Sequence, residues 1–89
     1  MGNYKVVFKP SIEKDLKKLP KEVVVRALGR IQDLTDSPFP PGSVKLSGAD
    51  RLYRLRVGDY RVVYEVDGKR EVVIVHYIRH RQEAYRRLP

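Results

Sequence analysis

The sequence contains no cysteine. Neither a disulfide framework nor a thiolate metal site can therefore stabilise the fold, and a reducing compartment is the simpler expectation. No apolar run approaches the roughly 20 residues that cross a bilayer, and the first residues show no signal-peptide pattern. We therefore expect a cytoplasmic protein without membrane contact, which is stabilised by the packing of its core.

Two kinds of binding motif are also missing. There is no glycine-rich loop of the phosphate-cradling kind, and no cluster of His, Asp and Glu has the spacing of metal ligands. Glu13, Asp15 and Glu22 are expected on helix surfaces instead, so we expect no metal and no cofactor. With 89 residues and no internal repeat, the chain has room for a single domain that spans residues 1–89.

The charge of the chain is strongly unbalanced, with a formal net charge of +8 and a pI near 10.0. Such a charge increases self-repulsion unless an anionic partner compensates it, and nucleic acid is the obvious candidate. The basic residues are mostly lysine up to Lys45, whereas from Arg51 onward they are all arginine except Lys69. Because the planar guanidinium matches pairs of phosphate oxygens, we expect phosphate contacts in the second half.

The hydrophobic pattern predicts the order of the elements. Residues 4–9 alternate like a half-buried strand, and helical spacing follows in residues 12–19 and 21–35. A proline-rich loop at residues 36–42, a short segment at 44–46 and three strand-like runs come next, at residues 52–57, 60–66 and 72–78. Residues 82–88 are expected to form a short C-terminal helix. The pattern predicts an α+β fold in which an antiparallel sheet, made of the N-terminal strand and a three-strand meander, is packed by an N-terminal helical hairpin and this helix.

The dipeptide Gly58-Asp59 is a turn signal, and it sets the register of the two strands around it. If it is a two-residue turn, Arg56 lies opposite Arg61, and Arg54 lies two residues along on the same face. Like charges directly opposite each other destabilise a sheet, and a polyanion would relieve this repulsion. The alternative interpretation is a solvated outer face on which Glu65 is a partial counter-charge.

The last segment, RHRQEAYRR from Arg79 onward, adds further cations, a histidine and a tyrosine after the third meander strand. Taken alone, it could be a basic helix that aids solubility, with Tyr85 as a packing residue and His80 on the surface. His76 lies inside an apolar run and is expected to be a packed strand residue, although the pattern does not fix its face.

Taken together, three segments resemble the RelE toxin pattern: KLSG at residues 45–48, LYRLRVGDYRVVYEV at 52–66 and HRQEAYR at 80–86. The resemblance spans nearly the whole chain and includes the first strand and the helical hairpin. It implies a microbial-RNase-like fold of the RelE/ParE superfamily and a toxin that cleaves messenger RNA in the ribosomal decoding site without a metal.

The resemblance also implies residue roles. By position, Arg61 would brace the phosphate, Arg81 would serve the leaving group or the phosphate, and Tyr85 would orient or stack on the substrate. Arg54 and Arg56 stand where the bacterial pattern favours lysines, and an arginine that stays protonated fits a phosphate clamp better than a base. His80 is the nearby group whose ordinary pKa suits proton transfer, and we take it as the candidate base. The further RNA contacts expected are Arg51, Arg79, Lys45 and Arg86.

Other readings stay open at this point. One is a ParE-like toxin that inhibits gyrase without nuclease activity, and another is a non-catalytic RNA-binding module with strand tyrosines stacked on bases. An inactive relative that still binds its antitoxin is a third. The partners implied by the resemblance are the ribosome with its mRNA and a cognate antitoxin, a small acidic protein expected to dock in the groove between the helical hairpin and the sheet.

Overall fold

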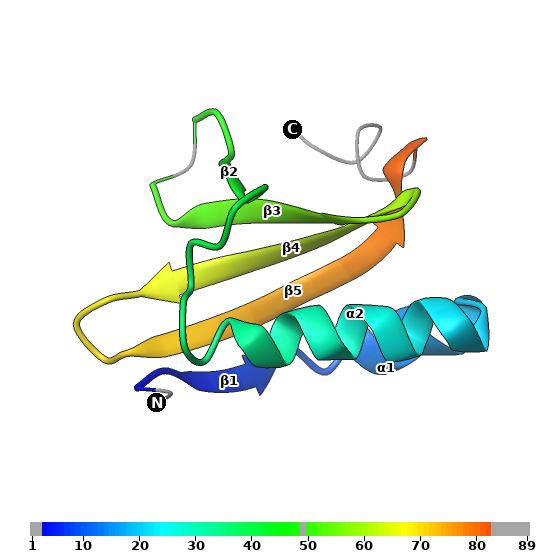
Figure 1. Cartoon of the computed structure of the whole chain (residues 1–89), viewed down its shortest axis with the longest axis horizontal. Coiled ribbons are helices and arrows are strands. Elements are labelled where there is room, and N and C mark those ends of the chain that lie inside the picture. Colours follow the sequence, from blue (N-terminus) through cyan, green and yellow to red (C-terminus); the bar gives the residue numbers. More distant parts are fainter. Residues whose placement is uncertain (1–2, 49, 83–89) are drawn as a thin grey trace.

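A computed structural model of the chain describes residues 3–48 and 50–82. It contains two helices and five strands, arranged around one sheet (Figure 1). In chain order the elements are β1 (Lys5–Phe8), α1 (Ile12–Lys18), α2 (Lys21–Asp33), β2 (Val44–Lys45), β3 (Leu52–Val57), β4 (Tyr60–Asp67) and β5 (Val72–His80). The predicted C-terminal helix lies outside the described residues, apart from Gln82.

The strands follow the order β1-β5-β4-β3-β2. Strands β3, β4 and β5 form the predicted antiparallel meander, and β2 pairs antiparallel with β3 along one edge. Strand β1 forms the other edge and runs parallel to β5, from Lys5 opposite Val72 to Phe8 opposite Val75. This pairing differs from the predicted antiparallel sheet. Two helices and three strands separate β1 from β5 in the sequence, and β5 then lies beside β1 in the same direction.

The turn between β3 and β4 confirms the predicted register. Gly58 has a φ of 59°, while Asp59 keeps an ordinary negative φ, which is the pattern of a two-residue type II′ turn with glycine first. Val57 consequently lies opposite Tyr60 and Arg56 opposite Arg61. A side chain other than glycine at position 58 would be strained, because L residues rarely adopt this positive φ.

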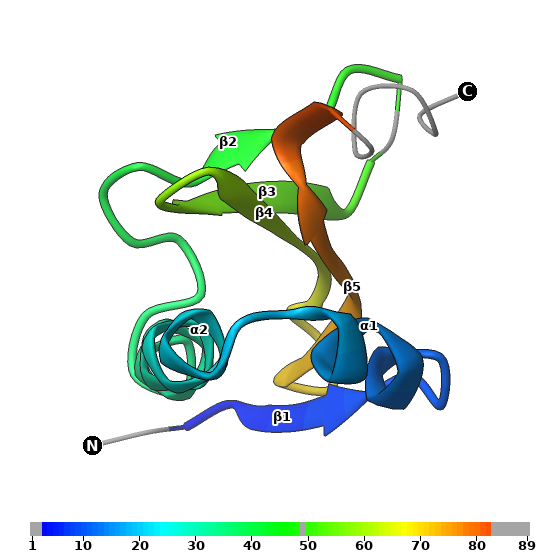
Figure 2. The ribbon, with the colours of Figure 1, turned by 90° about the vertical axis from the view of Figure 1, so that its right-hand side faces the viewer.

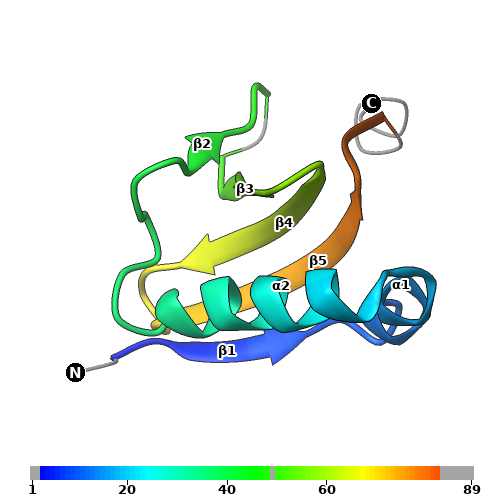
Figure 3. The ribbon, with the colours of Figure 1, turned by 45° about the vertical axis from the view of Figure 1, so that its right-hand side comes forward.

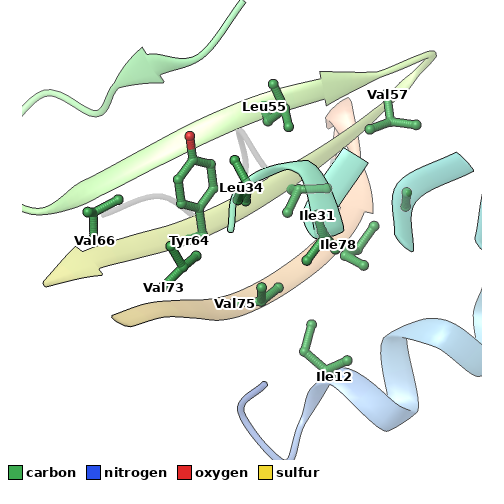
Figure 4. Packing of buried hydrophobic residues seen from close by; sticks show 12 residues of the cluster. Ile12, Ile31, Leu34, Leu55, Val57, Tyr64, Val66, Val73, Val75 and Ile78 are labelled. Carbon is green, nitrogen blue, oxygen red and sulfur yellow. The ribbon is translucent and has the colours of Figure 1, made fainter. Parts of the chain in front are cut away.

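Both helices lie on one face of the twisted sheet (Figures 2 and 3). The core between the helices and the sheet is built from Ile31 of α2, from Leu34 directly after this helix, and from alternate residues of the meander strands, such as Leu55, Tyr64 and Val75 (Figure 4). The Tyr64 hydroxyl donates a hydrogen bond of 2.9 Å to the Pro38 carbonyl, so the proline-rich loop is attached to the core. Within the described ranges, no helix is long and apolar enough to cross a membrane.

The opposite face of the sheet carries charged residues together with apolar ones such as Val63. Since the side chains of a strand alternate between the two faces, the residues between the core positions of β3, β4 and β5 point away from the helices. They include Arg54 and Arg56 of β3, Arg61 and Glu65 of β4, and Arg79 of β5. We call this surface the outer face.

Candidate functional site

Three arginines from neighbouring strands lie side by side across the outer face. Arg56 of β3 is opposite Arg61 of β4, and Arg61 is opposite Arg79 of β5. Residues that face each other in an antiparallel pair have Cβ atoms about 4.5–5.5 Å apart, so the three side chains start from adjacent positions. We call Arg56, Arg61 and Arg79 the arginine row.

A β-bulge at His76 creates the third position of this row. The β4–β5 pairing runs from Asp67 opposite Val72 to Tyr64 opposite Val75, and then shifts so that Val63 is opposite Tyr77. Without the extra residue, Arg61 would face Ile78, and Arg79 would point to the helical side. The bulge therefore turns Arg79 onto the outer face and Ile78 into the core, in keeping with the use of bulges to re-aim side chains beside functional sites.

The members of the row differ in exposure. Arg61, at the centre, is only 5% exposed, although it points away from the helical core. Arg56 is exposed, and its Nε donates a hydrogen bond of 3.3 Å to the Gly58 carbonyl in the adjacent turn. A guanidinium that has lost most of its hydration interacts more strongly with an anion, because the local dielectric is low. The low dielectric around Arg61 would therefore strengthen any contact that its guanidinium makes with an anion.

Arg79, at the end of the row, is contacted from two sides. Its guanidinium carbon lies 4.3 Å from the centre of the Tyr77 ring, a cation–π geometry. Its Nε is 3.8 Å from Oδ1 of Asp15 on helix α1. Burial raises the pKa of the Tyr77 hydroxyl, an effect that Arg79 partly opposes and Asp15 adds to. Neither contact of Arg79 could be predicted from the sequence.

The expectation that Asp15 lies on a helix surface is wrong. Asp15 is 9% exposed, and its Oδ2 accepts a hydrogen bond of 3.2 Å from the Ile78 backbone N–H. Asp15 follows the buried Ile12 by three residues and therefore shares its helix face. This spacing is the sequence feature that could have indicated its burial. Glu13 and Glu22 are exposed, as expected.

Two carboxylates of the outer face lie at the other end of β4 and have basic side chains as neighbours there. Oε1 of Glu65 is 3.1 Å from Nε2 of His76, and Arg51 lies 3.9 Å from Glu65 and 3.8 Å from Asp67. Asp67 also interacts with Arg70, at 4.0 Å. The outer face is thus divided, with the arginine row at one end and a mixed-charge cluster at the other. His76 is a strand residue, as expected, but it lies half-buried in this cluster.

The other residues predicted to contact RNA do not lie together. Arg54 is on the outer face, next to the row, and is half-buried, whereas Lys45 is exposed on the edge strand β2. Arg51 lies in the mixed-charge cluster, away from the row. Arg81 is exposed, and its backbone N–H donates to the Asp59 carbonyl at 2.8 Å. Tyr85 and Arg86 lie outside the described residues.

His80, the candidate base, is opposite Tyr60 at the end of β5. The two rings meet edge to face with centroids 5.4 Å apart, and Nδ1 of His80 lies 3.4 Å from the Gln82 backbone nitrogen, which donates to it. Strand alternation directs His80 toward the helical side rather than the outer face. A small polar hollow at this edge is nevertheless lined by His80, Asp15 and Arg79 together, so His80 borders the end of the row.

The chemistry available to this arrangement is the binding of a phosphate group. Guanidinium groups donate paired hydrogen bonds to phosphate oxygens and stay protonated throughout the accessible pH range. Among residues 3–48 and 50–82, no group of three or more His, Cys, Asp or Glu side chains could hold a metal ion. The row is thus suited to stabilise negative charge by preorganised donors.

The chain as a whole is similar to proteins of known family. Residues 6–85 match the family described as ParE toxin of type II toxin-antitoxin system, parDE. Toxin RelE3 of Methanocaldococcus jannaschii is 32% identical over 96% of this chain and 99% of that protein, and toxin RelE of Mycobacterium tuberculosis is 32% identical over 97% and 90%. A chain of the archaeal RelE-RelB complex from Pyrococcus horikoshii is 35% identical and aligns over 88% of this chain and 94% of that chain, with a TM-score of 0.78. Together with the fold, these matches show that the chain belongs to the RelE/ParE superfamily of toxins from type II toxin–antitoxin systems.

Proposed function

We propose that this toxin is a ribosome-dependent endoribonuclease that cleaves messenger RNA in the decoding site without a metal ion. The observation that carries the proposal is the arginine row, with the almost fully buried Arg61 between Arg56 and Arg79. A row of this kind matches a phosphodiester, which gains negative charge when its phosphorus is attacked. The resemblance of the strands around Arg61 and of the HRQEAYR segment to the RelE pattern favours this activity over gyrase inhibition.

The proposed reaction needs two proton transfers and one charge-stabilising site. The 2′-oxygen of a ribose forms a bond to the adjacent phosphorus while a base takes its proton. The bond from phosphorus to the 5′-oxygen then breaks, and that oxygen receives a proton. Arg61 braces the phosphate, Arg54 and Arg56 clamp it, Arg81 serves the leaving group, and Tyr85 orients the substrate. His80 remains the proposed base, and Arg51, Arg79, Lys45 and Arg86 the further RNA contacts.

Primer extension on messenger RNA after brief induction tests this function. The native chain should produce cuts within translated regions, and Arg61→Ala should abolish them because the central phosphate contact is lost. Arg70→Ala is the matched control, since Arg70 is an exposed arginine in the β4–β5 loop, at the far end of the sheet. DNA breaks without RNA cuts would instead identify a ParE-like inhibitor of gyrase.

We also propose a cognate antitoxin as the partner of this chain, with the ribosome and its mRNA as the target. The support is that related toxins were crystallised with RelB, as in the complex from Pyrococcus horikoshii. A hollow of about 380 Å³, lined mainly by apolar side chains, lies between β1 and the two helices; its residues include Phe8, Ile12, Leu16 and Leu28. It fits the apolar face of an antitoxin segment, while acidic residues of the same protein would pair with the basic surface.

A further inference from the structure

Strand β5 extends beyond its neighbour β1, and helix α1 covers the exposed edge. The pairing of β1 ends at Phe8 opposite Val75, and the Lys9 N–H still donates to the Val75 carbonyl at 3.0 Å. Strand β5 continues from there to His80. Beyond the end of β1, Oδ2 of Asp15 accepts a hydrogen bond from the Ile78 N–H on this edge of β5, and so replaces the missing strand partner. One oxygen of Asp15 therefore has a structural role.

The second oxygen of Asp15 is directed at the adjacent residue, Arg79. Oδ1 lies 3.8 Å from Nε of Arg79, and the Asp15 side chain is only 11% exposed while that of Arg79 is 24% exposed. In such a desolvated position the attraction between the two charges is screened much less than at the surface. Because Asp15 is fixed to the backbone of Ile78, it gives Arg79 an anchor that does not move relative to β5.

The ring of Tyr77 supplies a second restraint. With the guanidinium carbon 4.3 Å from the ring centre and Nε beside Asp15, Arg79 is held by a flat surface and by a point charge. The contact with Asp15 involves Nε, so the N–H groups of the two terminal guanidinium nitrogens can still donate hydrogen bonds to an oxyanion. This geometry prepares the end of the arginine row before substrate arrives.

We infer that Asp15, a residue of the helical hairpin, is a positioning residue of the arginine row and acts by fixing Arg79. This inference rests on the proposed nuclease function, and it connects helix α1 to the chemistry on the other face of the sheet. Arg79 ends the row that would hold the reacting phosphate. Its misplacement by about 1 Å can cost up to a hundredfold in rate, so the anchor should affect turnover more than binding.

The variant Asp15→Asn separates the two roles of the carboxylate. The amide oxygen can still accept from Ile78, whereas the charge beside Arg79 is removed. On programmed ribosomes we expect kcat to fall by about tenfold or more, while KM and the melting temperature stay close to those of the wild type. Asp15→Ala should lose stability as well. Glu13→Gln, the same change of charge on an exposed position of the same helix, should behave like the wild type.

A spectroscopic readout keeps this inference distinct from the proposed function. The Nε–H signal of Arg79, followed by ¹⁵N relaxation, should show a rigid side chain in the wild type and a mobile one in Asp15→Asn. An unchanged kcat in an active toxin, or an equally rigid Arg79 in the variant, would overturn the inference. If the wild type cleaves no RNA on ribosomes, the proposed function fails, and the relaxation data alone then decide whether Asp15 orders Arg79.

Discussion

Reversal of the charge of Arg56 should make the protein more stable and at the same time inactive. In the folded protein Arg56 is directly opposite Arg61, so its replacement by glutamate exchanges a repulsive cross-strand pair for an attractive one. Each such pair contributes about 0.2–1 kcal/mol, and solvent screening at the exposed Arg56 favours the lower half of that range. The hydrogen bond from Arg56 to the Gly58 carbonyl is lost, which offsets part of the gain.

The net effect should be an increase of up to about 0.5 kcal/mol in the free energy of unfolding, which corresponds to at most about 2–4 °C in the melting temperature of a domain of this size. Urea and thermal unfolding of Arg56→Glu, with Arg56→Gln as the neutral intermediate, measure it. Lys69→Glu makes the same change in net charge in the exposed β4–β5 loop, away from the arginine row, and should give little gain.

Salt provides the second part of this test. At about 1 M salt the Debye length falls to about 3 Å, so the repulsion within the row is screened and the advantage of Arg56→Glu should shrink. A variant that is less stable than the wild type at low salt, or a gain that high salt leaves unchanged, would refute the reasoning that the row stores electrostatic repulsion.

Three further predictions concern other parts of the molecule. His80→Gln should lower cleavage at neutral pH by at least about a hundredfold if His80 is the base, and full activity in primer extension would eliminate that role. Burial raises the pKa of Tyr64 above its ordinary value of 10.0, so the unfolded chain releases the hydroxyl proton first and stability should fall as the pH rises beyond about 10. The variant Tyr64→Phe loses the hydrogen bond to Pro38, which should cost about 1 kcal/mol in urea unfolding at pH 7. Its stability should also fall less steeply at alkaline pH. Binding of the cognate antitoxin, measured by titration calorimetry, should weaken as salt rises and on Leu28→Asp; affinity insensitive to both would exclude the proposed docking surface.

The elements and one register could be predicted from the sequence because their signals are local. Helical spacing, prolines and the Gly58-Asp59 turn each act within a few residues, and the turn alone was sufficient to place Arg56 opposite Arg61. The parallel pairing of β1 had no such signal, because its partner β5 lies at the other end of the chain. Its direction follows only from how the whole chain packs.

The candidate site could be predicted in part. Arg61 and Arg56 were identified with their pairing, but the position of Arg79 depends on the bulge at His76, which shifts the register of β5 by one residue. No residue type in the run of residues 72–78 marks such a shift. Asp15 was assigned to the surface because a carboxylate is rarely buried, and its reason for burial is a backbone N–H of Ile78, 63 residues away in sequence.

Single-turnover cleavage of messenger RNA on programmed ribosomes tests the central claim most directly, with Arg61→Gln compared with Arg70→Gln. Both variants lose one positive charge, but only the first removes the buried centre of the arginine row. We predict that Arg61→Gln lowers the cleavage rate by at least about a hundredfold while Arg70→Gln cleaves like the wild type. Equal rates for the two variants would contradict the claim that the row holds the scissile phosphate.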